Sequence, residues 1–289
     1  MQRVMVTGAG GQLGWELQRT APAEVACIAL SREQLDIADA QQVSDYLARE
    51  RPALLVNAAA YTAVDRAETE PRVAAQVNAE GPANLARACA THGVRLIHVS
   101  TDFVFDGKSS RPYLPDDATG PLGEYGRSKL EGERAVRAVL PGALVLRTGW
   151  VYSAWGSNFV KTMLRLMAER DELKVVVDQV GTPTWARGLA GFLWQAAAQD
   201  GHRGIYHWSD AGVCSWYDFA VAIAEEGRAA GLLERSPRVL PIPGSDYPTP
   251  AQRPSYSVLD KRSSWKDFGI EGVHWRVQLR AMLQELKEL

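Results

Sequence analysis

The sequence predicts a doubly wound α/β fold, in which a Rossmann parallel sheet is followed by a smaller C-terminal α/β substrate lobe. Two observations carry this prediction. Short apolar runs alternate with helical patterns through the first half of the chain, and a glycine-rich turn directly follows the first run. The 289 residues are 46% hydrophobic and 23% charged, which is enough to bury the core of one large domain or two modest ones.

Five apolar runs in the first half have the unbroken hydrophobic character of strands buried on both faces. They are residues 4–6, 25–30, 53–56, 94–99 and 143–146. Helical patterns separate them at 12–20, 41–49, 70–92 and 123–140, and Asp39 is a candidate N-cap for the second of these helices. Residues 1–150 are therefore predicted to form a dinucleotide-binding Rossmann domain.

The second half holds most of the tryptophans and is predicted to form a substrate-binding lobe, residues 151–289. Helices are expected at 158–170, 186–198, 215–231 and 275–289, short strands at 174–177 and 204–208, and an ordered proline-rich loop at 237–254. Residues 183–200 could instead pack back on the first sheet, so the boundary near residue 150 stays open.

Charge and composition exclude several classes of partner. A net charge near −2 gives no electrostatic reason to expect nucleic acid or an acidic membrane surface. The chain shows neither a secretion signal nor an apolar run long enough to span a membrane. The three cysteines are far apart, as expected for reduced thiols. We expect a cytoplasmic protein.

The turn after the first strand has glycines spaced three apart, at Gly8, Gly11 and Gly14. Glycine permits the tight turn, the close approach of a pyrophosphate and the packing of helix on strand. Free N–H groups at the helix start would hold the phosphate charge. The alternative is a structural turn without a ligand. The predicted cofactor-binding residues here are Gly8, Gly10, Gly11, Gln12, Leu13 and Gly14.

The tip of the second strand normally selects between the two nicotinamide dinucleotides. It reads Ser31-Arg32 and carries no acid, which favours NADPH, with Arg32 facing the 2′-phosphate and Ser31 donating a hydrogen bond; NADH stays possible. Alternatively, Arg32 is a solvated surface cation. Asp36 and Ile37 could frame the adenine edge or simply form a turn. Small side chains after the third strand, at Ala58, Ala59 and Ala60, would let a cofactor lie close to the backbone.

Tyr125 and Lys129 are four residues apart in the helix that follows the fourth strand, so they share one helix face. Thr101 stands just past that strand. Reduction of a ketone needs a hydride on carbon and a proton on oxygen. We expect the Lys129 ammonium to lower the pKa of the Tyr125 phenol and to hold the nicotinamide ribose. The Thr101 hydroxyl would polarise the substrate oxygen. The alternative is a surface Tyr-Lys pair beside a capping threonine.

The sequence gives little support to phosphate-loop, serine-hydrolase or metal-dependent chemistry. Gly107-Lys108-Ser109 looks like the tail of a phosphate-binding loop, but Asp102 stands where that loop needs its leading glycine. No Gly-x-Ser-x-Gly or His-Glu-x-x-His motif occurs, and the five histidines are scattered. No metal site is predicted from these patterns.

Longer stretches resemble the extended short-chain dehydrogenase/reductase family, and within it the reductases of nucleotide sugars. The matching segments are residues 11–17, 56–65, 99–107, 125–130, 147–152, 158–164 and 247–251. This resemblance implies a catalytic set of Thr101, Tyr125 and Lys129. It implies a pyrophosphate held at 11–13, and a cofactor site lined further by Asp36, Ile37, Ala60, Tyr61 and Thr62. Val99, Tyr125 and Lys129 complete the predicted cofactor-binding set. The residues that would touch a deoxyhexose are Thr101, Asp102, Tyr125 and Trp150.

The implied reaction is the NAD(P)H-dependent reduction of the 4-keto group of dTDP-4-dehydro-L-rhamnose, in dTDP-rhamnose biosynthesis. Two alternatives stay open: another reductase or epimerase of the same family, and a non-catalytic regulatory subunit on the same fold. Some relatives form homodimers that bind Mg²⁺ through interface glutamates. Glu16 is at a matching position, but that alone does not predict a metal site, and a homodimer is an open expectation. This sequence departs from the family pattern at Ser31, Phe103 and Tyr256.

Overall fold

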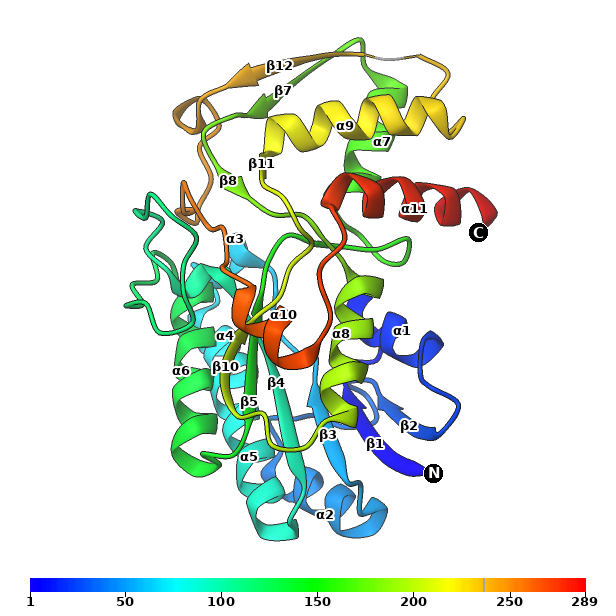
Figure 1. Cartoon of the computed structure of the whole chain (residues 1–289). Helices are drawn as coiled ribbons and strands as arrows, with labels where there is room; N and C mark the ends of the chain where they lie inside the picture. Colours follow the sequence, from blue (N-terminus) through cyan, green and yellow to red (C-terminus); the bar gives the residue numbers. More distant parts are fainter. Residues whose placement is uncertain (236) are drawn as a thin grey trace.

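A six-stranded, fully parallel sheet forms the centre of the molecule (Figure 1). The computed structural model describes residues 1–235 and 237–289. The strands lie in the order β10-β5-β4-β3-β1-β2. Their bounds are β1 Gln2–Thr7, β2 Val25–Leu30, β3 Leu54–Asn57, β4 Arg95–Thr101, β5 Leu144–Thr148 and β10 Gly204–His207. The predicted doubly wound fold is confirmed.

The register of the sheet places the functional segments along one edge. Thr7 pairs with Asn57, Asn57 with His98, and Thr101 with Thr148. Strands β3 and β5 are buried along their whole length, which explains their unbroken apolar runs. Because all strands run the same way, the segments that follow their carboxyl ends meet above this edge, where doubly wound folds bind ligands.

Helices cover both faces of the sheet because successive strand residues point to opposite sides. On one face, Val4 and Val6 pack with helices α1 (Gln12–Arg19) and α8 (Ala186–Ala198). On the other, Met5 packs with α2 (Ala40–Glu50), α5 (Gly81–His92) and α6 (Glu124–Val139). The predicted N-cap of α2 is confirmed, since the Asp39 side chain accepts a hydrogen bond from the backbone N–H of Gln42.

The region predicted as one helix over 70–92 is helical from Pro71 to His92, but a π-helical turn divides it. It consists of α4 (Pro71–Ala75), the π-helical turn η1 (Gln76–Glu80) and α5, which run on from one another. Short elements not predicted from the sequence are α3 (Val64–Ala67), η2 (Asp102–Val104), η3 (Gly244–Asp246) and α10 (Arg262–Phe268).

The second lobe has its own hydrophobic core, built around three helices and three pairs of short strands. The helices are α7 (Phe159–Glu169), α9 (Trp216–Ala229) and α11 (Trp275–Glu288). The pairs are β6 (Val151–Tyr152) with β9 (Thr184–Trp185), β8 (Val180–Gly181) with β11 (Cys214–Ser215), and β7 (Glu172–Val176) with β12 (Arg238–Ile242).

The prediction of a loop throughout 237–254 is wrong for β12, which lies inside that stretch. Pro241 sits within the strand, opposite Val175 of β7. In a two-stranded sheet each strand keeps one unpaired side, which tolerates a residue without a backbone N–H.

The second half of the chain also contributes to the main sheet. It supplies the outer strand β10 and helix α8, whose Leu189 and Phe192 are fully buried in the same core as Val4 and Val6. The boundary near residue 150 stays a prediction. Cys89 and Cys214 are buried free thiols, and Cys27 is a half-buried one. Across residues 1–235 and 237–289 no helix has the length and apolar character needed to cross a membrane.

Candidate active site

The glycine turn between β1 and α1 allows three backbone segments to approach closely. Gly8 has a φ of +77°, and a Cβ added there would lie 2.6 Å from the backbone N of Ala59. A Cβ added at Gly14 would lie 2.1 Å from the carbonyl oxygen of Gly8. Any side chain at either position would push apart the helix, the turn and the segment after β3. Gly11 is the N-cap of α1 and leaves the start of the helix uncovered by a side chain.

A cavity of about 290 Å³ opens beside this turn. It lies at the carboxyl ends of β1, β2 and β3, where this class of fold binds dinucleotides. Most of the predicted cofactor residues line it: Gly8, Gly10, Gly11, Ser31, Arg32, Asp36, Ile37, Ala58, Ala59, Ala60 and Tyr61. Glu33, Leu35 and Val77 line it as well and were missed, because nothing in their local sequence distinguishes them from turn and helix residues.

Seven predicted cofactor residues do not line this cavity: Gln12, Leu13, Gly14, Thr62, Val99, Tyr125 and Lys129. Leu13 and Gly14 are buried beneath the turn. The Gln12 side chain instead accepts a hydrogen bond of 2.9 Å from Asn158, in the segment that leads into α7. Gln12 thereby links the glycine turn to the second lobe.

An arginine and two carboxylates, Arg32, Glu33 and Asp36, line the cavity just after β2. The Ser31 hydroxyl donates a hydrogen bond of 2.6 Å to Glu33, which lowers the pKa of that carboxyl. The side chain of Arg32 is 71% exposed, and its nearest carboxylate, on Asp36, is 3.9 Å away. Arg32 is therefore only loosely held and can turn toward an anion bound in the cavity.

A buried polar network fixes the segment after β3. Asn57 accepts hydrogen bonds from the Thr7 hydroxyl (2.7 Å) and from the backbone N–H of Ala59 (3.1 Å). Because its oxygen accepts both, its amide nitrogen donates to Nδ1 of His98, 3.0 Å away. Next to it, the Asn78 side chain accepts from the backbone N–H of Tyr61. These amides hold the small residues 58–60 against the cavity.

The structure brings the three predicted catalytic side chains to the end of β4. Thr101 ends that strand, and its hydroxyl donates a hydrogen bond of 3.1 Å to Asp102. It also lies near enough to the Tyr125 phenol to influence the pKa of that phenol. Lys129 lies one helical turn after Tyr125 on α6 and is buried, with its ammonium donating a hydrogen bond of 2.7 Å to the carbonyl of Val99. The edge of the Tyr125 ring faces Phe103, at a centroid distance of 5.6 Å.

The electrostatics of this site differ from our expectation. Burial raises the pKa of Tyr125 to about 12, the neighbouring Thr101 side chain opposes the rise, and the Asp102 carboxylate adds to it. Burial lowers the pKa of Lys129 to about 8, against a raising effect of Glu133. The predicted lowering of the Tyr125 pKa by Lys129 is wrong for this structure, because the ammonium is directed to the Val99 carbonyl. Tyr125 is therefore a protonated phenol at neutral pH.

Asp102, Trp150 and Trp216 extend the candidate site from the end of β4 toward the second lobe. Asp102 is buried, its pKa is raised by burial to about 6, and a Cβ at Gly149 would lie 2.5 Å from its carboxyl carbon. Trp150 has a φ of +52°, unusual for a residue with a side chain. Its ring stacks on Trp216 with 3.5 Å between centroids and 3° between planes.

The opposing glycine at position 181 makes room for the Trp150 indole. A Cβ added there would lie 2.5 Å from Cε2 of Trp150. Sequence reasoning found Trp150 but missed Trp216 and Gly181. Their roles depend on contacts between distant segments, and no local pattern signals them.

The surroundings of Glu16 do not fit a divalent cation. Its buried carboxylate lies 3.6 Å from Arg187 and 3.8 Å from Arg19, and Glu285 pairs with the same two arginines. Burial raises the pKa of Glu16 to about 7. The guanidinium groups already supply the positive charge that a metal would bring. In the part of the chain that the structure describes, no group of three or more His, Cys, Asp or Glu side chains could hold a metal ion.

These features define a class of protein: an oxidoreductase of the short-chain dehydrogenase/reductase type, with a dinucleotide site on a glycine turn and a Thr-Tyr-Lys set at the end of β4. Comparison with known proteins narrows this class. A family model described as the RmlD substrate binding domain matches residues 1–288. The chain belongs to this family, and several curated relatives at about 40% identity are named dTDP-4-dehydrorhamnose reductase.

One such relative, from Burkholderia thailandensis, is 43% identical over 98% of this chain and 99% of its own length. A crystal structure of a dTDP-4-dehydrorhamnose reductase from Clostridium acetobutylicum has a TM-score of 0.93 and 38% identity, covering 99% of this chain and all of its own. The enzyme from Bacillus anthracis, solved in complex with NADP, has a TM-score of 0.92 and 35% identity, covering 99% of both chains.

Proposed function

We propose that this protein catalyses the NADPH-dependent reduction of the 4-keto group of dTDP-4-dehydro-L-rhamnose to dTDP-L-rhamnose. Family membership and the NADP complex of the Bacillus anthracis relative support this proposal. The single observation that carries it is the proximity of Thr101 and Tyr125, with the buried Lys129, at the end of β4. The neighbouring strand β3 leads into residues 58–61, which line the dinucleotide cavity.

The residues of the cavity would hold the cofactor. The glycine turn and the start of α1 suit the pyrophosphate, and residues 58–61 suit the remainder of the dinucleotide. When bound, NADPH supplies the hydride for the reduction. Lys129 would hold the nicotinamide ribose, and Arg32 would face the 2′-phosphate.

The proton comes from Tyr125. With a pKa near 12, its phenol carries a proton throughout the neutral range and can donate it to the C4 oxygen of the sugar as that oxygen gains negative charge. The Thr101 hydroxyl would donate a hydrogen bond to the same oxygen. Asp102 and Trp150 would contact the deoxyhexose ring. Phe103 has no hydroxyl group with which to bond the deoxyhexose.

Four further points belong to the proposal. We infer that NADPH is preferred over NADH because the tip of β2 offers Arg32 and no acid. We infer that Mg²⁺ is not required, because arginines surround Glu16. We expect the protein to act in the cytoplasm, on a nucleotide-sugar substrate. A homodimer stays an expectation.

The test is a spectrophotometric assay of the purified protein with dTDP-4-dehydro-L-rhamnose prepared in situ, with NADPH and NADH side by side. Stoichiometric loss of reduced cofactor and formation of dTDP-L-rhamnose would support the proposal. Interconversion of sugars without net cofactor oxidation would indicate an epimerase. Binding without any turnover would indicate a regulatory subunit on this fold.

A further inference from the structure

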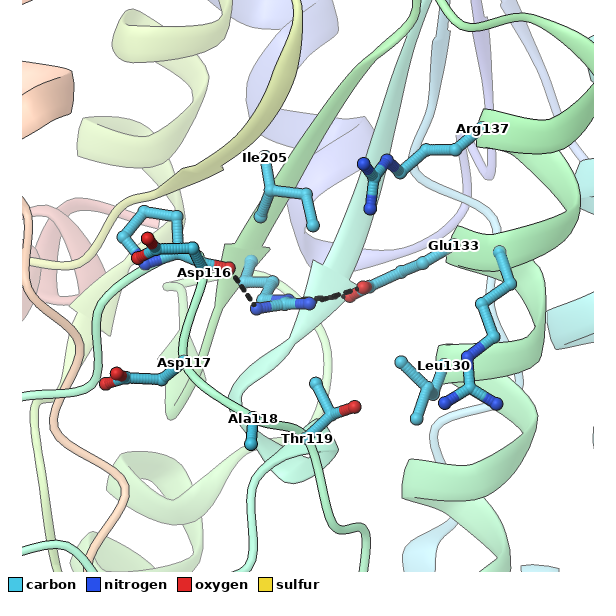
Figure 2. Close-up of a pocket in the computed structure, with 11 residues that line it drawn as sticks. Asp116, Asp117, Ala118, Thr119, Leu130, Glu133, Arg137 and Ile205 are labelled. Atoms are coloured by element: carbon cyan, nitrogen blue, oxygen red, sulfur yellow. Dashed lines mark hydrogen bonds and ion pairs between the residues drawn. The ribbon is translucent and has the colours of Figure 1, made fainter.

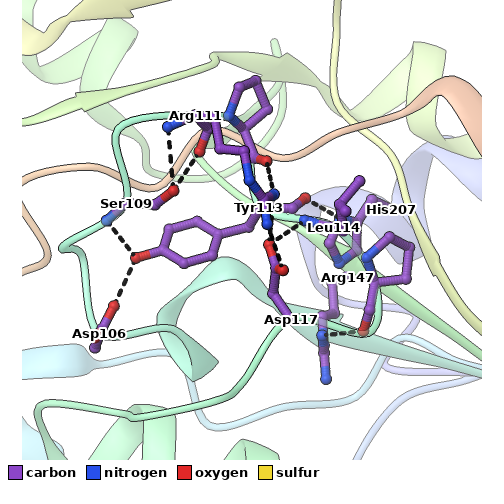
Figure 3. A network of polar contacts seen from close by, with 10 residues as sticks. Asp106, Ser109, Arg111, Tyr113, Leu114, Asp117, Arg147 and His207 are labelled. Atoms are coloured by element: carbon purple, nitrogen blue, oxygen red, sulfur yellow. Dashed lines mark hydrogen bonds and ion pairs between the residues drawn. The ribbon is translucent and has the colours of Figure 1, made fainter.

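A buried pair of opposite charges lies beneath the proposed catalytic groups. Glu133 of α6 and Arg147 of β5 are both 2% exposed, and two hydrogen bonds of 2.9 and 2.7 Å join the guanidinium to the carboxylate. A third hydrogen bond of 3.1 Å runs from Arg147 to the carbonyl of Pro115 (Figure 3). Arg147 is thus held on two sides.

The loop that carries Pro115 is itself well ordered by hydrogen bonds (Figure 3). The Tyr113 phenol donates to Asp106, and Asp117 accepts from both the Arg111 side chain and the backbone N–H of Leu114. A cavity of about 480 Å³ borders the pair and is lined by Glu133 and Arg147 together with Asp116, Asp117 and Ile205 (Figure 2). The pair therefore stands between this cavity and the end of β4.

Glu133 also reaches the proposed catalytic groups. Its carboxylate accepts a hydrogen bond from the hydroxyl of Ser100, the residue that precedes Thr101 on β4. It lies four residues after Lys129, so the two side chains share a helix face, and its negative charge raises the pKa of the Lys129 ammonium.

We propose that Glu133 is a positioning residue of the reductase: its carboxylate holds Ser100, and with it the strand end that carries Thr101, and it balances the positive charge of Lys129. This inference rests on the proposed function of the site.

The other groups around Lys129 cannot take over this electrostatic role. His98, on β4, is buried, and its pKa lies well below its ordinary value, through burial and then through Lys129, so the imidazole is neutral. Tyr125 is a protonated phenol, and Val99 offers a carbonyl dipole. Arg147 is already paired with the Glu133 carboxylate and, as a cation, cannot favour a second positive charge on Lys129. Among the described residues, Glu133 is the one charged side chain that does so.

The first experiment compares pH-rate profiles of the wild-type protein, Glu133→Gln and Glu131→Gln. Glu131 is exposed on the same helix, so its variant is a matched control. The rate should fall on the alkaline side as the Lys129 ammonium is lost, near pH 8 in the wild type. In Glu133→Gln the alkaline fall of the rate should move to lower pH by about one unit or more. The fold decrease in kcat should be larger than the fold increase in the Kd of NADPH. An unmoved alkaline fall, with activity reduced equally at every pH, would overturn the proposal.

The second experiment does not depend on turnover. The chain has only seven lysines, so the Lys129 signal can be assigned by NMR of lysine-labelled protein, using Lys129→Arg as the reference. Its pKa should fall by about one unit or more in Glu133→Gln and stay constant in Glu131→Gln. An equal Lys129 pKa in all three proteins would refute the proposal. Absence of turnover in the wild type would refute the proposed function instead.

Folding is checked by circular dichroism. If Glu133→Gln does not fold, because Arg147 is left buried without its partner, the double variant Glu133→Gln/Arg147→Met removes both charges and restores a neutral interior. In the double variant the Lys129 pKa should still lie below its wild-type value, because the Glu133 carboxylate that favours the ammonium is absent. An unchanged value in the double variant would also count against the proposal.

Discussion

Tyr125 shows how one side chain is prepared for donating a proton. Burial and the Asp102 carboxylate both favour the neutral phenol, and the neighbouring Thr101 side chain opposes them only in part. Tyr125→Phe keeps the ring and its contact with Phe103 but removes the proton. We expect kcat to fall by about a hundredfold or more, with NADPH affinity nearly unchanged. Steady-state kinetics and fluorescence titration of NADPH would measure this, and an unaltered kcat would exclude Tyr125 as the donor.

Arg32 is the residue on which cofactor choice should depend. Its guanidinium is 71% exposed and 3.9 Å from Asp36, so little intramolecular interaction is lost when it turns to a ligand. In Arg32→Ala the Kd of NADPH should rise by about tenfold or more, while that of NADH changes little. Arg165, an exposed arginine on α7, gives the control variant Arg165→Ala. Equal weakening of both cofactors would show that Arg32 does not meet the 2′-phosphate.

At the scale of elements, β8 and α9 together orient the Trp150 ring. Trp216, the first residue of α9, covers one face of the indole, and Gly181 of β8 approaches its edge. Gly181→Ala would place a methyl group 2.5 Å from the ring, so Trp150 must shift. We expect KM for the nucleotide sugar to rise about tenfold, with NADPH affinity retained.

Gly191→Ala is a suitable control for this variant. Gly191 lies within α8, and an added Cβ there meets no atom within 4 Å. This variant should keep the wild-type KM and be slightly more stable to heat, because alanine is the better helix former. A normal KM in Gly181→Ala would mean that Trp150 does not contact the sugar.

The elements differ in how well the sequence predicts them. The strands around the core were predictable because burial on both faces requires unbroken apolar runs, as in β3 and β5. Tyr125 and Lys129 were predictable because their relation is local, one helical turn apart. Trp216 and Glu133 were not, since each gains its role from a residue far along the chain. Strand β12 was missed because Pro241 resembles loop sequence.

At the scale of the whole molecule, buried histidines link stability to pH. Burial, followed by Arg147, lowers the pKa of His207 to about 3, and its Nδ1 donates to the Tyr113 carbonyl at 3.1 Å. The unfolded chain binds a proton at this residue near pH 6.5, whereas the folded protein does not until about pH 3. The contribution of His207 to stability is therefore complete above pH 6.5 and is lost as the pH falls toward 3.

Replacing His207 should flatten this dependence. His207→Asn keeps a donor near the Tyr113 carbonyl but cannot be protonated. The slope of unfolding free energy against pH between pH 6 and 4 should decrease by about 1 kcal/mol per pH unit. Urea titrations at a series of pH values would measure it, with exposed His92→Asn as the control. The remaining slope includes buried His98, and identical slopes in wild type and His207→Asn would disprove this account.

The path of the chain through the two cores has a consequence for how the halves can be separated. After β5 the backbone builds β6 to β9 of the second lobe, returns as α8 and β10 to complete the sheet, and leaves again through β11 and α9. It returns once more as α10 before ending in α11. The chain therefore passes between the two halves several times, and no single linker joins them. A single proteolytic nick near residue 150 should leave two fragments that copurify, and a gene truncated there would encode a sheet without its outer strand.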